Sequence, residues 1–241
     1  MQQNDLDMWK GGLGFMKNRI LIIAAHPDDE ILGCGGTVSR LVSEGASAFT
    51  MILGEGATSR DDNRNRDSRI EEIKTLKRNI EKANEIIGVE ETFSFDFPDN
   101  RFDSVPLLDI VKTIEKVKIR VQPNIVFTHF SNDLNIDHYI TNKAVLVATR
   151  PMSNEVVKEV YAFEVLSSTE WNFPLSFSPN YFVEITNSLK EKQMAMNVYK
   201  GELRKYPHPR SLKAIEINAE YWGTRTGLGK AEAFATLRCM R

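Results

Sequence analysis

A histidine and three acidic residues follow directly on an apolar run near the start of this chain. The run spans 20–25, and the polar residues are His26, Asp28, Asp29 and Glu30. Such a run is typical of a buried parallel strand, and open α/β sheets bind ligands at the carboxyl ends of their strands. Adjacent carboxylates repel one another unless a cation neutralises them. The pattern therefore predicts a catalytic metal site at this strand end.

A third metal ligand must come from another part of the chain. A catalytic zinc usually takes three protein ligands and keeps a fourth position for water, and His26 and Asp29 supply two. Of the other histidines, His129 and His138 flank a polar segment that follows the apolar run 124–128. If these strands are neighbours, a His-Asp-His site forms at their ends, and iron(II) suits such a site as well as zinc. A polar loop residue is the alternative interpretation of His129.

Two motifs in the chain resemble those of the PIG-L/LmbE-like zinc N-deacetylases, which remove acetyl groups from N-acetylglucosamine-type sugars. The resemblance extends over about 19–238. It rests on these segments: Ala25-His26-Pro27-Asp28-Asp29-Glu30, Gly35-Gly36-Thr37, Asn135-Ile136-Asp137-His138 and the ending Ala231-Glu232-Ala233-Phe234 with Leu237-Arg238.

The resemblance implies a role for each matching residue. His26, Asp29 and His138 are the implied zinc ligands, one zinc per chain. Asp28 is the implied general base, which takes a proton from a metal-bound water whose pKa the ion lowers toward about 7. Attack on the acetamide carbonyl then yields acetate and a free amino sugar, with the oxyanion stabilised by the ion.

One position departs from the family pattern. The family often has a histidine where this chain has Asn135, and asparagine donates hydrogen bonds but does not titrate. Either Asn135 acts electrostatically or another group assists, for which His208 is the first candidate and His129 the second. A surface turn is the alternative interpretation of the segment 206–210. We expect the carboxylate of Asp137 to orient a ligand histidine by contacting the ring nitrogen that does not bind the metal.

Substrate contacts are predicted at three further residues. Asp99 follows a strand end and is expected to hold a sugar hydroxyl, or else to cap a turn. Arg210 is expected to reach the site beside His208. Trp171 is expected to stack on a pyranose ring, although loop aromatics often pack instead. The polar segment 54–67 is interpreted as a solvated loop or as a flap over the site.

Apolar runs alternate with helical patterns along the chain, which predicts an α/β fold with three layers. We expect a doubly wound, mostly parallel, Rossmann-like sheet with a less regular C-terminal cap. A glycine-rich loop at 33–37, with Cys34 as a small buried residue, is expected to precede the first helix. The predicted strands are 20–25, 48–53, 92–97, 124–128, 159–165 and 181–185, and the predicted helices are 38–45, 68–87, 107–121, 139–149, 188–203, 211–222 and 230–238.

Composition excludes several other classes of protein. The net charge of −2 gives no support to a nucleic-acid partner, and no apolar run is long enough to span a membrane. The two cysteines fit a reducing cytoplasm. An N-terminal arm over 1–18, which lacks the apolar core of a signal peptide, is expected before a single domain over 19–241. The sequence is compatible with a homo-oligomer.

These observations lead to a cytoplasmic metal-dependent deacetylase as the first hypothesis. Its expected substrate is a small or nucleotide-linked N-acetyl-hexosamine derivative. A non-catalytic, metal-containing carbohydrate-binding module is the alternative, and Asn135 is its best support. A hydrolase for a larger acyl amide is a third hypothesis. The volume of the pocket beside the metal would distinguish it from a deacetylase.

Overall fold

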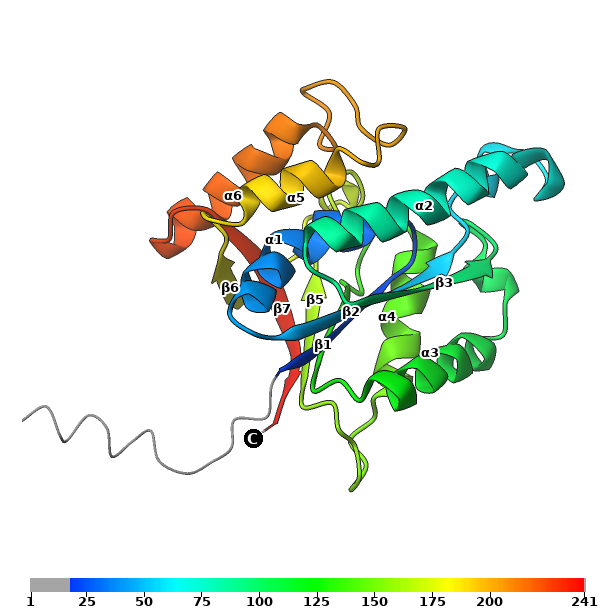
Figure 1. The fold of residues 1–241 in the computed structure, drawn as a ribbon, viewed down its shortest axis with the longest axis horizontal. Helices are drawn as coiled ribbons and strands as arrows, with labels where there is room; N and C mark the ends of the chain where they lie inside the picture. The colour runs from blue at the N-terminus through cyan, green and yellow to red at the C-terminus, as the bar shows by residue number, and fades with distance from the viewer. Residues whose placement is uncertain (1–17, 241) are drawn as a thin grey trace, which may run out of the picture.

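The computed structural model describes residues 18–240, within which seven strands form one sheet in the order β3-β2-β1-β4-β5-β7-β6 (Figure 1). Strands β1 to β5 are parallel, and β7 runs antiparallel to both β5 and β6. The strands are β1 (Arg19–Ala24), β2 (Ser47–Gly54), β3 (Glu91–Phe97), β4 (Ile125–His129), β5 (Glu159–Phe163), β6 (Tyr181–Glu184) and β7 (Ala231–Cys239). The mostly parallel α/β sheet is the one that the sequence predicts.

Helices cover both faces of the sheet, as a strand buried on both sides requires. Alternate residues of β1 enter two separate cores: Ile22 packs with residues of α1, α2, α5 and α6, and Ile23 packs with residues of α3 and α4. Figure 1 shows the same division into three layers. The helices are α1 (Asp29–Ser43), α2 (Ile70–Ile86), α3 (Leu107–Val121), α4 (Ile136–Ala148), α5 (Leu189–Met196) and α6 (Leu212–Thr226).

The strand order reverses direction at β1. This strand pairs with β2 on one side and with β4 on the other. The chain after β1 enters α1 on one face, whereas the chain after β4 enters α4 on the opposite face. Loops that leave in opposite directions open a crevice between two strand ends, which is where α/β proteins bind ligands. The two predicted ligand motifs follow these two strands.

The first helix begins at Asp29, not at Val38 as the sequence predicts. The glycines expected in a loop therefore lie inside α1. A Cβ atom on Gly33 would lie 2.3 Å from Cδ2 of Phe163 in β5, so glycine lets the helix approach the sheet closely. Glycine costs about 1 kcal/mol in a helix relative to alanine, and this close packing is the compensating gain.

The predicted helix over 230–238 is wrong, because this segment forms β7. It pairs with β5 and β6, and its Glu232 is buried. Glu232 accepts hydrogen bonds from the backbone N–H groups of Gly36 and Thr37 in α1 and from Nζ of Lys192 in α5. These contacts tie β7 to α1 and α5, and the pairing of β7 with β5 and β6 outweighs the helical propensity of the local sequence.

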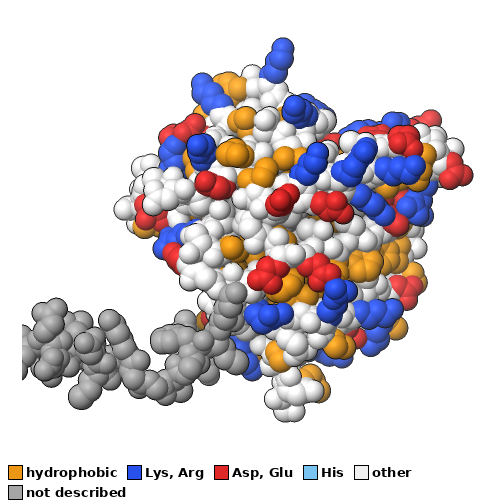
Figure 2. All heavy atoms as spheres, in the orientation of Figure 1, with side chains coloured by type: hydrophobic (Ala, Val, Ile, Leu, Met, Phe, Trp, Pro, Cys, Tyr) orange, Lys and Arg blue, Asp and Glu red, His pale blue; other side chains and the backbone are white. Residues whose placement is uncertain are grey.

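The remaining boundaries differ in detail. The helix expected over 188–203 ends at Met196. The predicted N-terminal arm lies, apart from Asn18, outside the described residues. Among residues 18–240 no helix combines the length and apolar character needed to cross a bilayer. Basic and acidic side chains are interspersed over the face seen in Figure 2.

Candidate active site

Two short connections bring the predicted ligands together. His26 and Asp29 lie where β1 passes into α1, and His138 lies in the first turn of α4. Since β1 and β4 are adjacent and parallel, both connections leave the same edge of the sheet. The neighbouring strand order therefore unites side chains that are more than a hundred residues apart in sequence.

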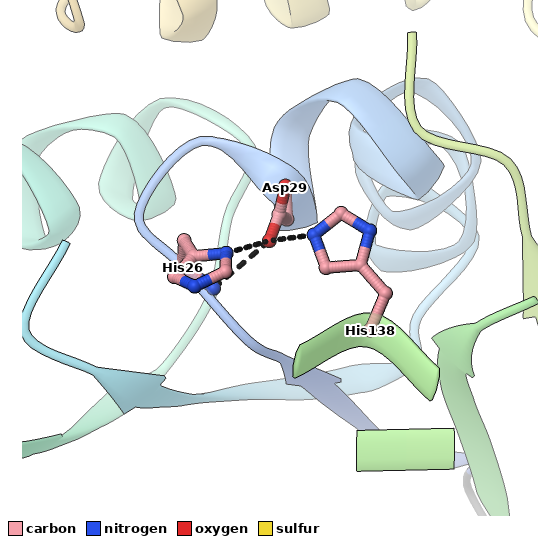
Figure 3. A group of neighbouring side chains, drawn as sticks. All are labelled: His26, Asp29 and His138. Carbon is pink, nitrogen blue, oxygen red and sulfur yellow. Dashed lines mark hydrogen bonds and ion pairs between the residues drawn. The ribbon is translucent and has the colours of Figure 1, made fainter. Parts of the chain in front are cut away.

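The three side chains converge on one carboxylate oxygen (Figure 3). Oδ2 of Asp29 lies 3.4 Å from Nδ1 of His26 and 3.2 Å from Nε2 of His138. All three potential ligand atoms lie within 4.8 Å of one another. Two imidazole nitrogens and one carboxylate oxygen form a donor set that suits zinc or iron(II). The residues present therefore fit the metal that the sequence predicts.

A carboxylate lies behind each of the two histidines. Oδ2 of Asp137 is 3.0 Å from Nε2 of His26, and Oδ1 of Asp133 is 3.1 Å from Nδ1 of His138. Each carboxylate can hold a proton on the nitrogen that faces away from Asp29, which leaves the facing nitrogen free to bind a metal.

Sequence reasoning placed Asp137 in such a position and missed Asp133. Asp133 accepts hydrogen bonds from the hydroxyls of Ser168 and Thr169. Burial opposes its ionisation, but the contacts with His138 and these hydroxyls lower the pKa of Asp133 to about 2. Its only signal in the sequence is an acid in the same connection as a ligand, which polar turns commonly contain.

Asp28 is buried beside the ligands in a strained backbone conformation. Its φ of 98° is in the left-handed region, which costs about 1–3 kcal/mol for a non-glycine residue. Burial raises the pKa of its carboxyl well above the ordinary value, although Arg210, 3.3 Å away, opposes the rise. A carboxylate of raised pKa is a better proton acceptor, as a general base requires.

Glu30 supports Asp28 from inside the protein. Its Oε2 accepts a hydrogen bond from the backbone N–H of Asp28, and its Oε1 accepts from the hydroxyl of Tyr199 and the amide of Asn84. Burial raises the pKa of Glu30 to about 7 despite these hydrogen bonds. The sequence shows Glu30 only as one more acid in the motif, since its partners lie in α2 and beyond α5.

A cavity of about 220 Å³ opens over this cluster. The structure brings Asp99, Asn135 and Arg210 into its lining but neither Trp171 nor His208. The ring of Trp171 instead lies edge-on to the ring of His208, with 5.6 Å between centroids. The lining residues are His26, Pro27, Asp28, Asp29, Gly56, Ser59, Arg60, Asp99, Asn100, Asn135, His138, Ser167, Ser168, Glu202, Arg204 and Arg210.

Asp99 and Asn135 both have protein partners. Asp99 accepts a hydrogen bond from the backbone N–H of Ser59, and its other oxygen is 3.3 Å from Nε2 of His26. Asn135 caps α4 by accepting from the N–H of Asp137, and its amide group donates to Asn100. The amide carries a second N–H, so Asn135 keeps one donor for a ligand.

The segment 54–67 is packed at its start. Ala57 and Thr58 are fully buried, and the buried carboxylate of Glu55 pairs with Arg64 and Arg66. This packing favours the loop interpretation over a flap for that part of the segment.

His129 lies behind the ligands. Its ring stacks on that of His138 with 3.9 Å between centroids, and its Nε2 accepts a hydrogen bond from the backbone N–H of Ala25. Burial lowers the pKa of His129 well below the ordinary value, so its neutral form is favoured. This position suits support of a ligand better than proton transfer to a substrate.

A protein-family model matches the part of the chain that carries this cluster. The model of the PIG-L family, described as GlcNAc-PI de-N-acetylase, matches residues 21–149, which is more than half of the chain. The chain belongs to this family, as the motifs predict.

Two curated relatives are deacetylases by name. "Uncharacterized deacetylase YaiS" of Escherichia coli K12 is 28% identical, and the match covers 74% of this chain and 86% of the relative. "Diacetylchitobiose deacetylase" of Thermococcus kodakarensis is 24% identical, and the match covers 89% of this chain and 81% of the relative. These two matches extend over most of the chain.

Solved structures share the fold. N,N'-diacetylchitobiose deacetylase of Pyrococcus horikoshii superposes with a TM-score of 0.72 at 18% identity, covering 91% of this chain and 83% of that one. GalB, the 4-carboxy-2-hydroxymuconate hydratase of Pseudomonas putida KT2440, superposes with a TM-score of 0.71 at 20% identity, covering 92% and 96%. Because the fold also occurs in a hydratase, the reaction must be argued from the site.

Proposed function

We propose that this protein is a metal-dependent hydrolase that removes the N-acetyl group from an N-acetyl-hexosamine derivative, giving acetate and a free amine. One observation carries the proposal: a carboxylate and two imidazoles converge in a cavity, with the buried carboxylate of Asp28 beside them. The family is consistent with this chemistry.

His26, Asp29 and His138 would hold one zinc or iron(II) ion. When bound, such an ion supplies a water of lowered pKa and a Lewis acid for the acetyl oxygen. The carboxylates of Asp137 and Asp133 keep the two imidazoles oriented. The orientation of the two imidazoles is thus fixed without substrate.

Asp28 takes the proton of the attacking water and returns it to the leaving nitrogen. Burial raises the pKa of Asp28, which strengthens its carboxylate as a base. The protonated carboxyl can then act as the acid. Arg210 holds the carboxylate through its Nη1. His208 positions this arginine, because its Nδ1 accepts a hydrogen bond from the backbone N–H of Arg210.

Asn135 supplies a hydrogen bond to the developing oxyanion from its remaining amide N–H. Its other N–H and its oxygen fix the side chain, so little reorganisation is needed. Asp99, on another wall of the cavity, is suited to accept a hydrogen bond from a sugar hydroxyl. These roles fit a small or nucleotide-linked amino sugar as substrate.

A non-catalytic carbohydrate-binding module has less support. A binding module does not need a second buried carboxylate at a strained position next to its metal ligands, and maintaining Asp28 there costs stability. The cytoplasmic location and a homo-oligomeric assembly stay predictions from the sequence.

The test is acetate release from a panel of N-acetylglucosamine derivatives by wild type and Asp28→Asn, with metal content measured on both proteins. We expect Asp28→Asn to retain the metal and to lose about 10²–10⁴-fold in kcat, the usual contribution of a general base. Asp109→Asn, at an exposed aspartate of α3, is the matched control and should keep full activity. Metal binding without acetate release from any sugar would contradict the proposal.

A further inference from the structure

Ser167 lines the cavity in a backbone conformation that serine disfavours. Its φ of 72° lies in the left-handed region. Glycine is the usual residue there because it lacks a Cβ atom, and asparagine and aspartate are the common exceptions. A serine held in this conformation beside a reactive site is a reason to ask what its hydroxyl does.

Hydrogen bonds from the turn itself hold Ser167 in place. The carboxylate of Glu170 accepts from the backbone N–H of Ser167 at 2.6 Å and from that of Ser168 at 3.3 Å. The backbone N–H of Val165 donates to the hydroxyl of Thr169 at 2.8 Å. The turn after β5 therefore fixes the position from which the hydroxyl of Ser167 extends.

This hydroxyl contacts the arginine that lies against the predicted base. Oγ of Ser167 accepts a hydrogen bond from Nε of Arg210 at 2.6 Å. Nη1 of the same guanidinium lies 3.3 Å from Oδ2 of Asp28 and 3.5 Å from Oε2 of Glu202. Because the guanidinium is planar, a partner at Nε fixes the direction in which Nη1 points. Ser167 thus influences how one arginine is shared between two carboxylates.

We propose that Ser167 is a positioning residue, whose hydroxyl holds the guanidinium of Arg210 against Asp28. Its disfavoured backbone conformation is retained because it places this hydroxyl. Without the hydroxyl, the guanidinium is free to turn toward Glu202, and Asp28 loses the contact that holds its carboxylate. The inference rests on the proposed function for the role of Asp28, and Ser167 acts on the reaction only through Arg210.

Two substitutions separate the hydroxyl from the backbone. Ser167→Gly and Ser167→Ala both remove the hydroxyl, but only glycine suits the left-handed conformation. We expect both variants to lose at least about 10-fold in kcat, as for a lost hydrogen bond to a charged group, with KM changed by less than about 3-fold. We expect Ser167→Ala to melt about 2–4 °C below Ser167→Gly, because alanine keeps the backbone strain.

Two kinetic results would overturn the proposal. One is a kcat of Ser167→Gly equal to that of wild type, and the other is a loss confined to KM, which would make Ser167 a substrate contact. Equal melting temperatures of Ser167→Gly and Ser167→Ala would refute the part that concerns the backbone.

Gln122 provides the matched control pair. It is an exposed residue at the C-terminal end of α3, with a left-handed φ of 51°, and it lies outside the lining of the cavity. Gln122→Gly and Gln122→Ala should show the same order of melting temperatures, and both should keep the kcat of wild type. A loss of kcat as large as in the Ser167 variants would attribute the effect to stability and overturn the proposal.

Ser167→Thr tests rescue by a second hydroxyl. We expect its kcat to stay within about 3-fold of wild type, because the acceptor for Nε of Arg210 is kept. We expect it to melt below Ser167→Gly, because a β-branched residue strongly disfavours a positive φ. Activity and stability then rank Ser167→Gly and Ser167→Thr in opposite orders, which a merely structural serine would not produce. A kcat as low as that of Ser167→Ala would contradict the role of the hydroxyl.

Hydrogen exchange at Nε of Arg210 separates this inference from the proposed reaction, because it needs no turnover. The signal is assigned as the one missing from the nitrogen-edited proton spectrum of Arg210→Lys. We expect this N–H to exchange with water at least about 10-fold faster in Ser167→Gly than in wild type, since its acceptor is gone. Unchanged exchange would overturn the inference. Faster exchange, together with no acetate release by wild type from any sugar, would refute the reaction alone.

Discussion

The two halves of the molecule contribute to the site in different ways. The connections after β1 and β4 supply every predicted metal ligand, within two short motifs. The region after β5 supplies groups that surround the predicted base: Tyr199 beside Glu30, and Arg210 against Asp28. The predicted metal ligands are thus local features of two strand ends, whereas the charges around the predicted base come from distant segments.

The contrast extends to how each half is stabilised. The parallel half packs apolar residues on both faces of β1 and β4. The C-terminal half is tied to α1 by the buried pair of Lys192 and Glu232. A buried charge is costly unless it is paired, so the link between this half and α1 depends on a polar contact in addition to apolar packing.

The largest predicted effect is that of Lys192→Met on the stability of the C-terminal half. This variant leaves the carboxylate of Glu232 buried without its cation, and we expect the free energy of unfolding to fall by about 3–5 kcal/mol. Urea denaturation measures the change. Lys190→Met, at an exposed lysine of the same helix, should change stability little. Equal stability of the two variants would mean that the pair does not hold the C-terminal half.

A pH effect of similar size is expected at Glu30. Its pKa rises from 4.5 to about 7 on folding, so the folded state binds this proton more tightly than the unfolded state. The stability from this group is complete below pH 4.5 and is lost as the pH rises to about 7, a change of about 3 kcal/mol.

Glu30→Gln isolates this effect, because glutamine does not titrate. The stability of the metal-free wild type relative to Glu30→Gln should fall between pH 4.5 and about pH 7. Urea titrations at several pH values give both curves. Curves that stay parallel would show that Glu30 ionises normally and that burial beneath Asp28 has no electrostatic consequence.

The smallest effect tests the carboxylate that sequence reasoning missed. Asp133→Asn should weaken metal binding by about 10–100-fold, because His138 loses the acceptor that orients its ring. Competition with a chelator measures the affinity. Asp137→Asn is the matched variant on His26 and should lose a similar amount. A normal affinity in Asp133→Asn alone would make Asp133 a loop residue held by Ser168 and Thr169.

Local patterns were sufficient for many of the elements. The helix predicted over 107–121 is α3, because its apolar residues repeat at helical spacing and no tertiary contact opposes them. The strand predicted over 20–25 is β1 with a difference of one residue at each end. Both segments bury the residues that their own pattern marks as apolar.

The failed predictions occur where tertiary packing outweighs local preference. Glycines at 33–36 indicate a loop, yet Gly33 lies in α1 because the helix must touch Phe163. Ala231 and its neighbours favour a helix, yet they form β7 between two strands. His208 and Trp171 were expected in the cavity, and the structure pairs their rings with each other outside its lining.

The sequence by itself determined the ligand types and the strand ends that carry them, because a strand followed by His26, Asp28 and Asp29 needs only its own short connection to place these groups. Only the tertiary structure decided which charges remain unpaired. Arg204 and Arg210 are six residues apart and look alike in sequence, but one meets Asp28 and the other meets no acid in the described part of the chain. Pairing depends on distances between segments that only folding sets, and the contact of Arg210 with Asp28 is one that the sequence cannot show.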